Sequence, residues 1–234
     1  MKPLLVLAAF PVVLMGWASC SHSGTGHAAL PDPRAVDKSV PEYKNPFHPS
    51  TYAHFVARKD YRKTYDVYKD DTLLNRQPKK SRKIFVCLDE QRGQYLVDGL
   101  VAMDFPLSSG VKAYPTKTGD YAVISKKEDH TSNLYGKMYD AEGKCINYNA
   151  ESTDPIPEGG RFDGSPMPYW QRLTNAGLGL HVGKVRRHPV SHGCVRLPRN
   201  VAEILYRQTS IGTPVTIRKT PLPVPEAQKV PAVR

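Results

Sequence analysis

Several features are missing from this sequence. Beyond the N-terminus no apolar run is long enough to cross a membrane as a helix. No internal repeat is evident, and the four cysteines lack the tight paired spacing of common zinc modules. The 234 residues are therefore expected to form one sizeable domain, with extensions at its ends.

Acidic residues are also in short supply, 22 against 33 basic ones, which leaves a net charge of +11. This excess favours an acidic partner: nucleic acid, an anionic membrane surface or a carboxylate-rich polymer. The densest basic cluster, residues 79–83, is interpreted as a solvated linker rather than a nucleic-acid patch. We therefore expect no nucleic-acid partner.

The N-terminus has the pattern of an export signal. Lys2 precedes an apolar stretch, Leu4 to Trp17, which is too short to span a bilayer. Ala18-Ser19-Cys20 then resembles a bacterial lipoprotein cleavage site, although Trp17 stands where an aliphatic residue is usual. Residues 1–20 are predicted to be a signal peptide and Cys20 a lipid anchor, with ordinary cleavage further on as the alternative. The expected location is the cell envelope or periplasm.

The rest of the chain divides into three parts. Residues 21–82 are predicted to be a tether and N-terminal extension, with a short helix within 51–75 packing on the main domain. Residues 83–219 are predicted to form the main folded domain. Residues 220–234 are rich in proline and are predicted to be disordered. Inside the domain, the polar and turn-rich segment 126–168 is expected to be irregular and functional, and whether it acts as a lid stays open.

The pattern of the main domain is that of a mainly β fold with one prominent helix. Asp98-Gly99 separates two apolar runs and predicts a hairpin. The helix is expected at 199–208, after the segment that carries the chemistry, because apolar residues recur there at helical spacing. The remaining strands are predicted at 84–88, 121–124, 178–182 and 214–217.

The reactive constellation is Ser191-His192-Gly193-Cys194-Val195-Arg196, with His181 upstream. A thiolate is the reactive form of cysteine, and nearby imidazole or cationic groups are expected to lower the thiol pKa from about 8.5. Glycine beside the nucleophile allows a sharp turn that brings backbone N–H groups toward a developing oxyanion. These residue types point to acyl transfer through cysteine.

The sequence resembles the L,D-transpeptidase catalytic domain, a family of bacterial cell-wall enzymes with a cysteine nucleophile. The signature consists of residues 180–183 and 190–198, and the similarity extends over about 83–218. Further matching segments are 91–100, 109–121, 129–136 and 164–170. Lys117 departs from the pattern, since the family usually has proline there. The resemblance implies a β-sandwich, peptidoglycan stem peptides as substrates, acylation by carbapenems and no cofactor.

The resemblance also implies roles for individual residues. Cys194 is the nucleophile, His181 its base, and the Val182 carbonyl the group that orients the imidazole. Gly193 and Cys194 supply oxyanion N–H groups, with His192 nearby. The substrate contacts are then assigned to Arg196, which would bind a carboxylate, to Met167 and Trp170 as pocket walls, and to Ser191, which would steady the loop.

Plainer interpretations stand beside these roles. His181 could be a satisfied core histidine and Cys194 a structural cysteine. His192 could serve only to order the loop, Arg196 could pair with an internal carboxylate, and Met167 and Trp170 could belong to the core. A zinc site built from His181, His188, His192 and Cys194 is a further alternative that we do not favour.

Three questions stay open at the level of sequence. The acyl acceptor could be an amine of another stem peptide, giving a cross-link with release of terminal D-alanine. It could equally be water, giving an L,D-carboxypeptidase, or a protein amine, giving an anchoring transferase. A binding module without catalysis is a different class of function. Cys87 and Cys145 could form a disulfide or remain free thiols.

Overall fold

A computed structural model describes residues 29–77 and 81–232. The predicted signal peptide and Cys20 lie outside these residues. In the part of the chain that is described, no helix is both long and apolar enough to span a bilayer.

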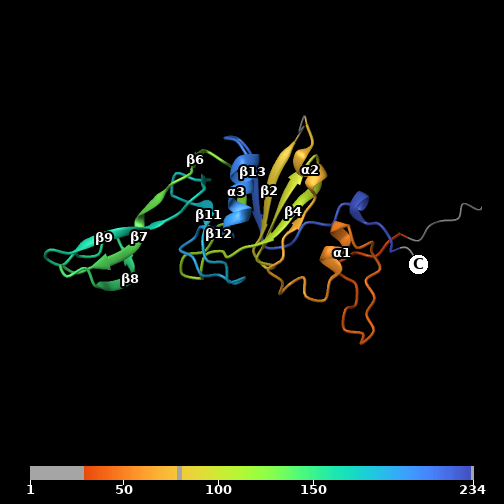
Figure 1. The fold of residues 1–234 in the computed structure, drawn as a ribbon, viewed down its shortest axis with the longest axis horizontal. Coiled ribbons are helices and arrows are strands. Elements are labelled where there is room, and N and C mark those ends of the chain that lie inside the picture. The colour runs from red at the N-terminus through yellow and green to blue at the C-terminus, as the bar shows by residue number, and fades with distance from the viewer. Residues whose placement is uncertain (1–28, 78–80, 233–234) are drawn as a thin grey trace, which may run out of the picture.

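A six-stranded sheet forms the centre of the molecule (Figure 1). Its strands follow the order β1-β4-β3-β2-β13-β5, and all neighbours are antiparallel except the parallel pair β2 and β13. Asp98 and Gly99 both have positive φ, 52° and 80°, which is the geometry of the predicted two-residue hairpin. The strands are β1 (Tyr68–Lys69), β2 (Arg82–Cys87), β3 (Arg92–Val97), β4 (Leu100–Pro106), β5 (Gly119–Ala122) and β13 (Pro214–Arg218).

A smaller sheet and the main helix cover one face of the central sheet. The smaller sheet has the order β12-β11-β10-β6, and the helix α3 (Arg199–Gln208) follows β12 directly. Side chains of both sheets and of α3 share one apolar core, to which Val97, Leu180 and Leu205 belong. The mainly β layered fold with one prominent helix is thus confirmed. The strands of the smaller sheet are β6 (Ser125–Lys127), β10 (Trp170–Arg172), β11 (Gly179–Val182) and β12 (Val195–Leu197).

The part of the N-terminal extension around its first helix covers the opposite face of the central sheet. Its helix α1 (Tyr52–Ala57) begins at Thr51, whose side chain accepts a hydrogen bond from the His54 N–H. Successive strand residues point to opposite faces, so Leu96 packs toward α1 while Tyr95 and Val97 enter the main core. The predicted helix within 51–75 exists, but it is short, and a second helix, α2 (Asp71–Asn75), follows it. Residues 29–77 are packed structure rather than a tether.

The proline-rich C-terminal segment also differs from its prediction. Val224 is buried in the cluster around α1, and a 3-10 turn, η1 (Glu226–Gln228), follows. The Gln228 side chain bonds both the N–H and the carbonyl of Val101. Proline content indicated disorder, but the backbone of this segment pairs with the extension, as the bridge between Phe47 and Pro231 shows. Residues 224–232 are therefore ordered.

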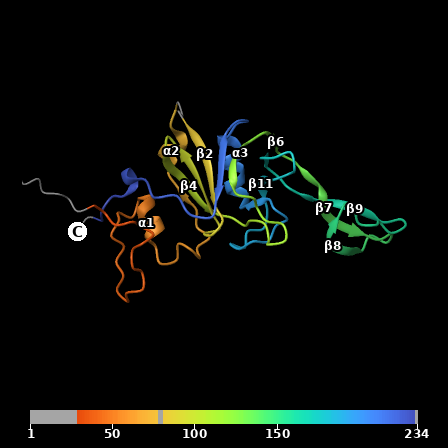
Figure 2. The same cartoon turned by 180° about the vertical axis from the view of Figure 1, so that it is seen from behind.

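The segment expected to be irregular forms a three-stranded sheet that projects from the body (Figure 2). Its strands are β7 (Thr131–Tyr139), β8 (Cys145–Glu151) and β9 (Arg161–Pro166), in the order β8-β7-β9. The many turn residues of 126–168 lie between these strands. Gly136 and Gly164 allow close backbone approach, since a Cβ at either position would lie within about 2 Å of a carbonyl oxygen.

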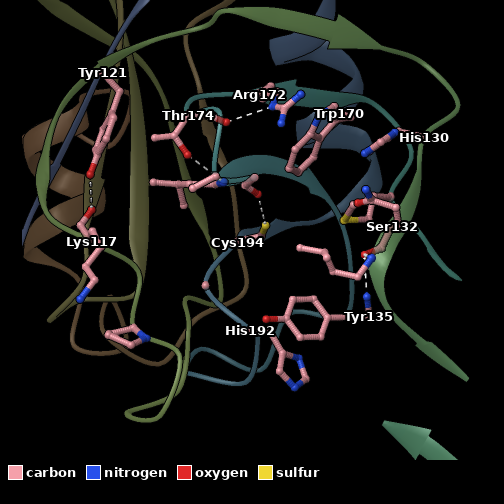
Figure 3. Close-up of a pocket in the computed structure, with 18 residues that line it drawn as sticks. Lys117, Tyr121, His130, Ser132, Tyr135, Trp170, Arg172, Thr174, His192 and Cys194 are labelled. Atoms are coloured by element: carbon pink, nitrogen blue, oxygen red, sulfur yellow. Dashed lines mark hydrogen bonds between the residues drawn. The ribbon is translucent and has the colours of Figure 1, made fainter. Parts of the chain in front are cut away.

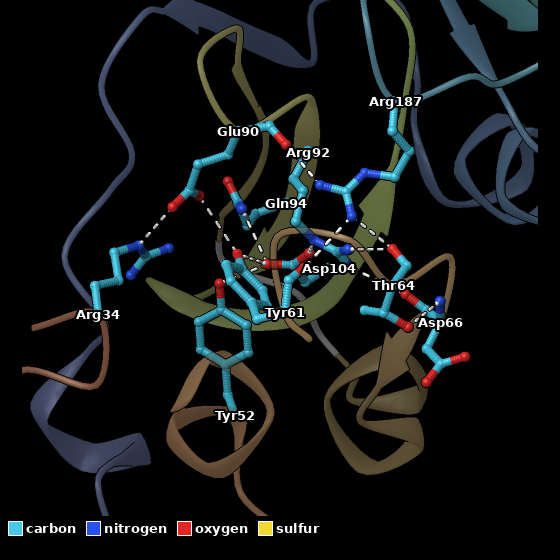
Figure 4. A network of polar contacts seen from close by, with 10 residues as sticks. All are labelled: Arg34, Tyr52, Tyr61, Thr64, Asp66, Glu90, Arg92, Gln94, Asp104 and Arg187. Carbon is cyan, nitrogen blue, oxygen red and sulfur yellow. Dashed lines mark hydrogen bonds and ion pairs between the residues drawn. The ribbon is translucent and has the colours of Figure 1, made fainter. Parts of the chain in front are cut away.

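A buried polar network joins the extension to the central sheet (Figure 4). Arg92 and Asp104, both fully buried, form an ion pair, and Tyr52 and Tyr61 donate to the same Asp104 carboxylate at 2.7 and 3.0 Å. Gln94 adds a further donor at 3.0 Å. A buried charge is tolerated only when it is paired and hydrogen-bonded, and this carboxylate is both.

Removing that carboxylate is expected to destabilise the protein strongly. In Asp104→Asn the Arg92 guanidinium stays buried without its counter-charge, so the free energy of unfolding should fall by about 3–5 kcal/mol. Asp120→Asn, which removes an exposed partner of Arg218, is the control and should change stability little. Denaturant unfolding measures both; equal effects would show that the network does not support the fold.

Candidate active site

The predicted base lies on one strand of the small sheet, and the predicted nucleophile lies just before the neighbouring strand. β11 and β12 pair in parallel, with His181 opposite Arg196, and Cys194 immediately precedes β12. Parallel strands need a crossover connection, and here it is the loop 183–194. Residues thirteen positions apart in the sequence are thereby brought to one end of the small sheet.

His181 is buried, and its ring orientation is fixed. Its Nδ1–H donates to the Val182 carbonyl at 2.8 Å, as the resemblance implied. This leaves Nε2 as the nitrogen that can accept a proton. Burial lowers the pKa of His181 to about 4, and the positive charges of Arg196 and His130 act in the same direction, against the bond to Val182. The imidazole is therefore neutral at physiological pH.

The Cys194 thiol is also neutral, which differs from the sequence expectation. Burial raises the pKa of Cys194, and this outweighs a hydrogen bond from Gly179 and the charge of Arg196. The thiol donates to the Gly177 carbonyl at 3.3 Å. Nearby cations indicated a lowered pKa, but the desolvation cost of a thiolate at this half-buried position is larger.

The nucleophile loop is held by short side chains. Ser191 donates to the Cys194 carbonyl and accepts a hydrogen bond from the Gly193 N–H at 3.2 Å. Gly193 has φ 113°, a conformation that other residues rarely adopt. Ser191 therefore lies where it can steady the loop.

Two residues that sequence reasoning missed fix the same loop. Thr116 donates to the Gly193 carbonyl at 2.6 Å and accepts from the Gly110 N–H at 2.8 Å. A Cβ at Gly110 would lie 2.8 Å from the Gly193 Cα. The matching segment 109–121 could have pointed to this role, because small residues there allow close approach to the signature.

His192 lies in an aromatic cluster rather than over the thiol. Its ring stacks on Tyr135 at 4.4 Å and tilts against Tyr114 at 4.8 Å. The contact with Tyr135, in β7, joins the nucleophile loop to the projecting sheet, and Tyr114 comes from the segment between β4 and β5. The placement favours the loop-ordering interpretation of His192 over an oxyanion role.

Two cavities meet at Cys194. The larger, about 550 Å³, is shown in Figure 3 and is lined on its far sides by Lys117, His130 and Arg172. The smaller, about 180 Å³, is lined by His181, Ser191 and Arg196. Residues that both cavities share are Ser132, Tyr135, Met167, His192 and Cys194. The thiol is thus reachable from two sides, and the projecting sheet forms part of each wall.

Met167 and Trp170 are pocket walls, and Trp170 is also buried. The indole lies between His130, at 5.0 Å, and His181, at 5.9 Å, measured between ring centroids. Gly179 makes room for it, since a Cβ there would lie 2.5 Å from the ring. Trp170 therefore limits the water around His181 as well as shaping the cavity.

Arg196 projects toward the smaller cavity along the space left by Gly183. A Cβ at Gly183 would approach the aliphatic part of the Arg196 side chain to 2.8 Å. Among the described residues, no carboxylate forms an ion pair with Arg196. Its positive charge is available to a ligand, in contrast to the internal pairing considered from sequence.

The other cysteines and histidines form no second centre in the part of the structure described. Cys87 and Cys145 are free thiols, in β2 and β8 of different sheets. No group of three or more His, Cys, Asp or Glu side chains is placed to hold a metal among the described residues. His188 bonds the Arg186 carbonyl at 3.0 Å, which gives no support to the zinc alternative.

The fold and the site define a mainly β protein whose thiol and imidazole face a common cavity. Residues 81–217, more than half of the chain, match the family model of the L,D-transpeptidase catalytic domain, YkuD. The chain belongs to this family, whose general function is peptidoglycan cross-linking.

The chain is also similar to individual members. It is 31% identical over 121 residues to the probable L,D-transpeptidase 3 of Mycobacterium tuberculosis, covering 49% of this chain and 38% of that protein. Solved L,D-transpeptidases from Mycobacterium smegmatis and Stackebrandtia nassauensis, each 22% identical, align over 59% and 71% of this chain. They align over 58% and 65% of their own chains, with TM-scores of 0.45 and 0.44. The chain spans well under two thirds of the curated relative's length.

The pKa shifts predict an unusual pH profile for the reaction of Cys194. With His181 titrating at about 4, the base is lost only as pH falls through that value. Both kcat/KM and the rate constant for acylation of Cys194 should therefore stay constant from about pH 5 through neutrality. A rate–pH series measures this. A rate that falls with a midpoint near pH 6.5, the ordinary pKa of histidine, would contradict a His181 that stays neutral down to about pH 4.

Proposed function

We propose that the protein is an L,D-transpeptidase that acts on peptidoglycan stem peptides through a thioester on Cys194. The observation that carries the proposal is the pairing of β11 with β12, which brings an oriented imidazole and a half-buried thiol to one cavity. Two further observations support peptidoglycan stem peptides as the substrate. The wall of the larger cavity carries basic side chains and no carboxylate, and the chain belongs to the L,D-transpeptidase family.

The first half-reaction removes the terminal D-alanine. The Cys194 sulfur attacks the carbonyl carbon before that residue while His181 Nε2 takes the thiol proton, because neither group is charged at rest. The C–N bond then breaks, and the proton passes from His181 to the departing amine. A thioester remains on Cys194 and conserves the energy of the peptide bond.

The second half-reaction transfers the acyl group to an amine. The acceptor nitrogen attacks the thioester, its proton passes to His181 and returns to the sulfur, and a new amide is formed. The two cavities that meet at Cys194 support a reaction with two large substrates, one on each side. Hydrolysis by water, as in an L,D-carboxypeptidase, and transfer to a protein amine use the same nucleophile and are the alternatives.

We assign the oxyanion donor to the Cys194 N–H. The Gly193 N–H is engaged with Ser191 at rest, so it can contribute only if that bond yields. A well-placed donor of this kind contributes roughly 3 kcal/mol to the transition state. The ordered Ser191-to-Cys194 segment keeps such a donor in place before substrate arrives, which is what makes the interaction effective.

Charge around the site supports an acidic substrate. Side chains lining the larger cavity include Lys117 and Arg172 but no carboxylate, and those of the smaller one include Arg196 and again no carboxylate. Stem peptides carry free carboxylates, which such walls attract. For location we propose the cell envelope, with Cys20 as a lipid anchor; this rests on the N-terminal sequence pattern alone.

Tetrapeptide muropeptides and a carbapenem test whether the protein is an L,D-transpeptidase that uses Cys194. The wild type should release D-alanine and form a covalent carbapenem adduct, seen as an intact-mass increase; Cys194→Ala should do neither. His181→Ala should lower turnover by about 100-fold or more, since a positioned base contributes 10²–10⁴-fold. Analysis of the muropeptide products identifies the acceptor as amine or water.

Two outcomes would contradict the proposal. A wild-type protein that forms no adduct and releases no D-alanine would leave a binding role. A near-normal rate in His181→Ala would remove this residue as the base.

Lys117 provides a test of the substrate's charge. It lines the larger cavity in place of the usual proline and is exposed, so Lys117→Ala should raise KM for a carboxylate-bearing stem several-fold with little change in kcat. Lys112→Ala, an exposed lysine outside both cavity linings, is the control. An equal effect of the two substitutions would show that Lys117 contributes only to general charge attraction.

A further inference from the structure

The loop that connects the base to the nucleophile is also fixed to the N-terminal extension. Its central residue, Arg187, has φ 57°, a left-handed conformation that is uncommon for arginine. Figure 4 shows its guanidinium among residues of the extension and the central sheet. A non-glycine residue is held in this conformation only where surrounding contacts compensate for it.

The compensating contacts are hydrogen bonds to backbone carbonyls. The Arg187 guanidinium donates to the carbonyls of Thr64 at 2.6 Å and Tyr61 at 3.4 Å, and through its other terminal nitrogen to Glu90 at 2.8 Å. Thr64 and Tyr61 belong to the extension, whereas Glu90 lies in the turn between β2 and β3. One side chain thus connects the loop, the extension and the central sheet.

The reach of the guanidinium explains why arginine stands here. Its planar fork presents several N–H donors in fixed directions, whereas the ammonium group of lysine is a compact point charge. Burial lowers the pKa of Arg187, as does the neighbouring charge of Arg92. The charge is therefore held at a desolvation cost, which carbonyl acceptors offset.

The loop transmits this attachment to Cys194 through a second set of bonds. The N–H groups of Val190 and Ser191 both donate to the Ser109 carbonyl, at 2.8 and 3.1 Å. The Ser109 N–H in turn donates to the side chain of Gln91 at 2.9 Å. Gln91 follows Glu90, whose carbonyl accepts from Arg187. The turn between β2 and β3 therefore holds the loop directly, through Glu90, and also through the chain of bonds from Gln91 to Ser191.

We propose that Arg187 is a positioning residue, through which the extension 29–77 holds the nucleophile loop in its reactive geometry. The extension lies outside the residues that match the family, 81–217. It is then a working part of this enzyme rather than a spacer. The expected effect on acylation rests on the proposed function. The attachment of the loop to the extension does not.

The test compares Arg187→Ala, Arg187→Lys and Arg186→Ala in the full chain. Arg186 is the matched control, because its loop contact is made by its backbone N–H, to the Ser108 hydroxyl at 2.8 Å. Three readouts are taken: the rate of Cys194 acylation by a carbapenem, the rate of its alkylation by iodoacetamide, and amide hydrogen exchange at Val190 and Ser191. Thermal unfolding identifies any variant that does not fold.

Arg187→Ala should lower the acylation rate constant by about 10- to 100-fold, the effect expected of a small displacement of reacting groups. Alkylation by iodoacetamide should not fall, since the thiol itself is untouched. Exchange at Val190 and Ser191 should accelerate. Arg187→Lys should recover part of the rate, and Arg186→Ala should behave as the wild type.

An acylation rate for Arg187→Ala within twofold of that for Arg186→Ala would overturn the proposal, as would unchanged amide exchange. A parallel loss of alkylation would assign the effect to the thiol and also overturn it. If Arg187→Ala fails to fold, Arg187→Lys takes its place, and an acylation rate and an amide exchange rate both equal to those of Arg186→Ala would overturn the proposal. A wild type that is never acylated contradicts the proposed function, while amide exchange still tests the attachment.

Discussion

The parallel pairing of β11 with β12 is the constraint on which the site depends. It sets His181 opposite Arg196 and places Cys194 at the start of its strand. Because parallel strands cannot be joined by a tight turn, the chain must pass through the loop 183–194, and the reactive geometry depends on what holds that loop. Contacts of Thr116, Gly110 and Ser191 fix the part of the loop next to the thiol. Contacts of Arg187 fix the part that lies further from it.

Burial determines the chemistry that this geometry can perform. It raises the pKa of Cys194 and lowers that of His181 to about 4, so both groups are neutral before substrate binds. In the proposed reaction, a proton therefore moves from Cys194 to His181 only when the sulfur attacks a carbonyl.

The sequence predicted the features that follow from local pattern and missed those that depend on distant contacts. Asp98-Gly99 indicated a hairpin because few other pairs accept two positive φ values, and the signature predicted the contact between His181 and the Val182 carbonyl. The catalytic roles of Cys194 and His181 stay predictions. Proline and turn residues predicted irregular structure at 126–168 and disorder at 220–234. The first segment instead forms a three-stranded sheet, and most of the second is ordered by packing on the extension. Desolvation of Cys194 and the contacts of His192 needed the three-dimensional structure, since neither is set by neighbours in sequence.

The central claim is that Cys194 carries the acyl group, and trapping it tests the claim most directly. The protein would be mixed with a tetrapeptide muropeptide, quenched in acid within the first turnovers and digested for peptide mass spectrometry. If Cys194 is the nucleophile, a peptide containing it should have a mass increased by that of the stem without its terminal D-alanine. D-alanine release with an unmodified Cys194 at every quench time, or an adduct on another residue, would contradict it.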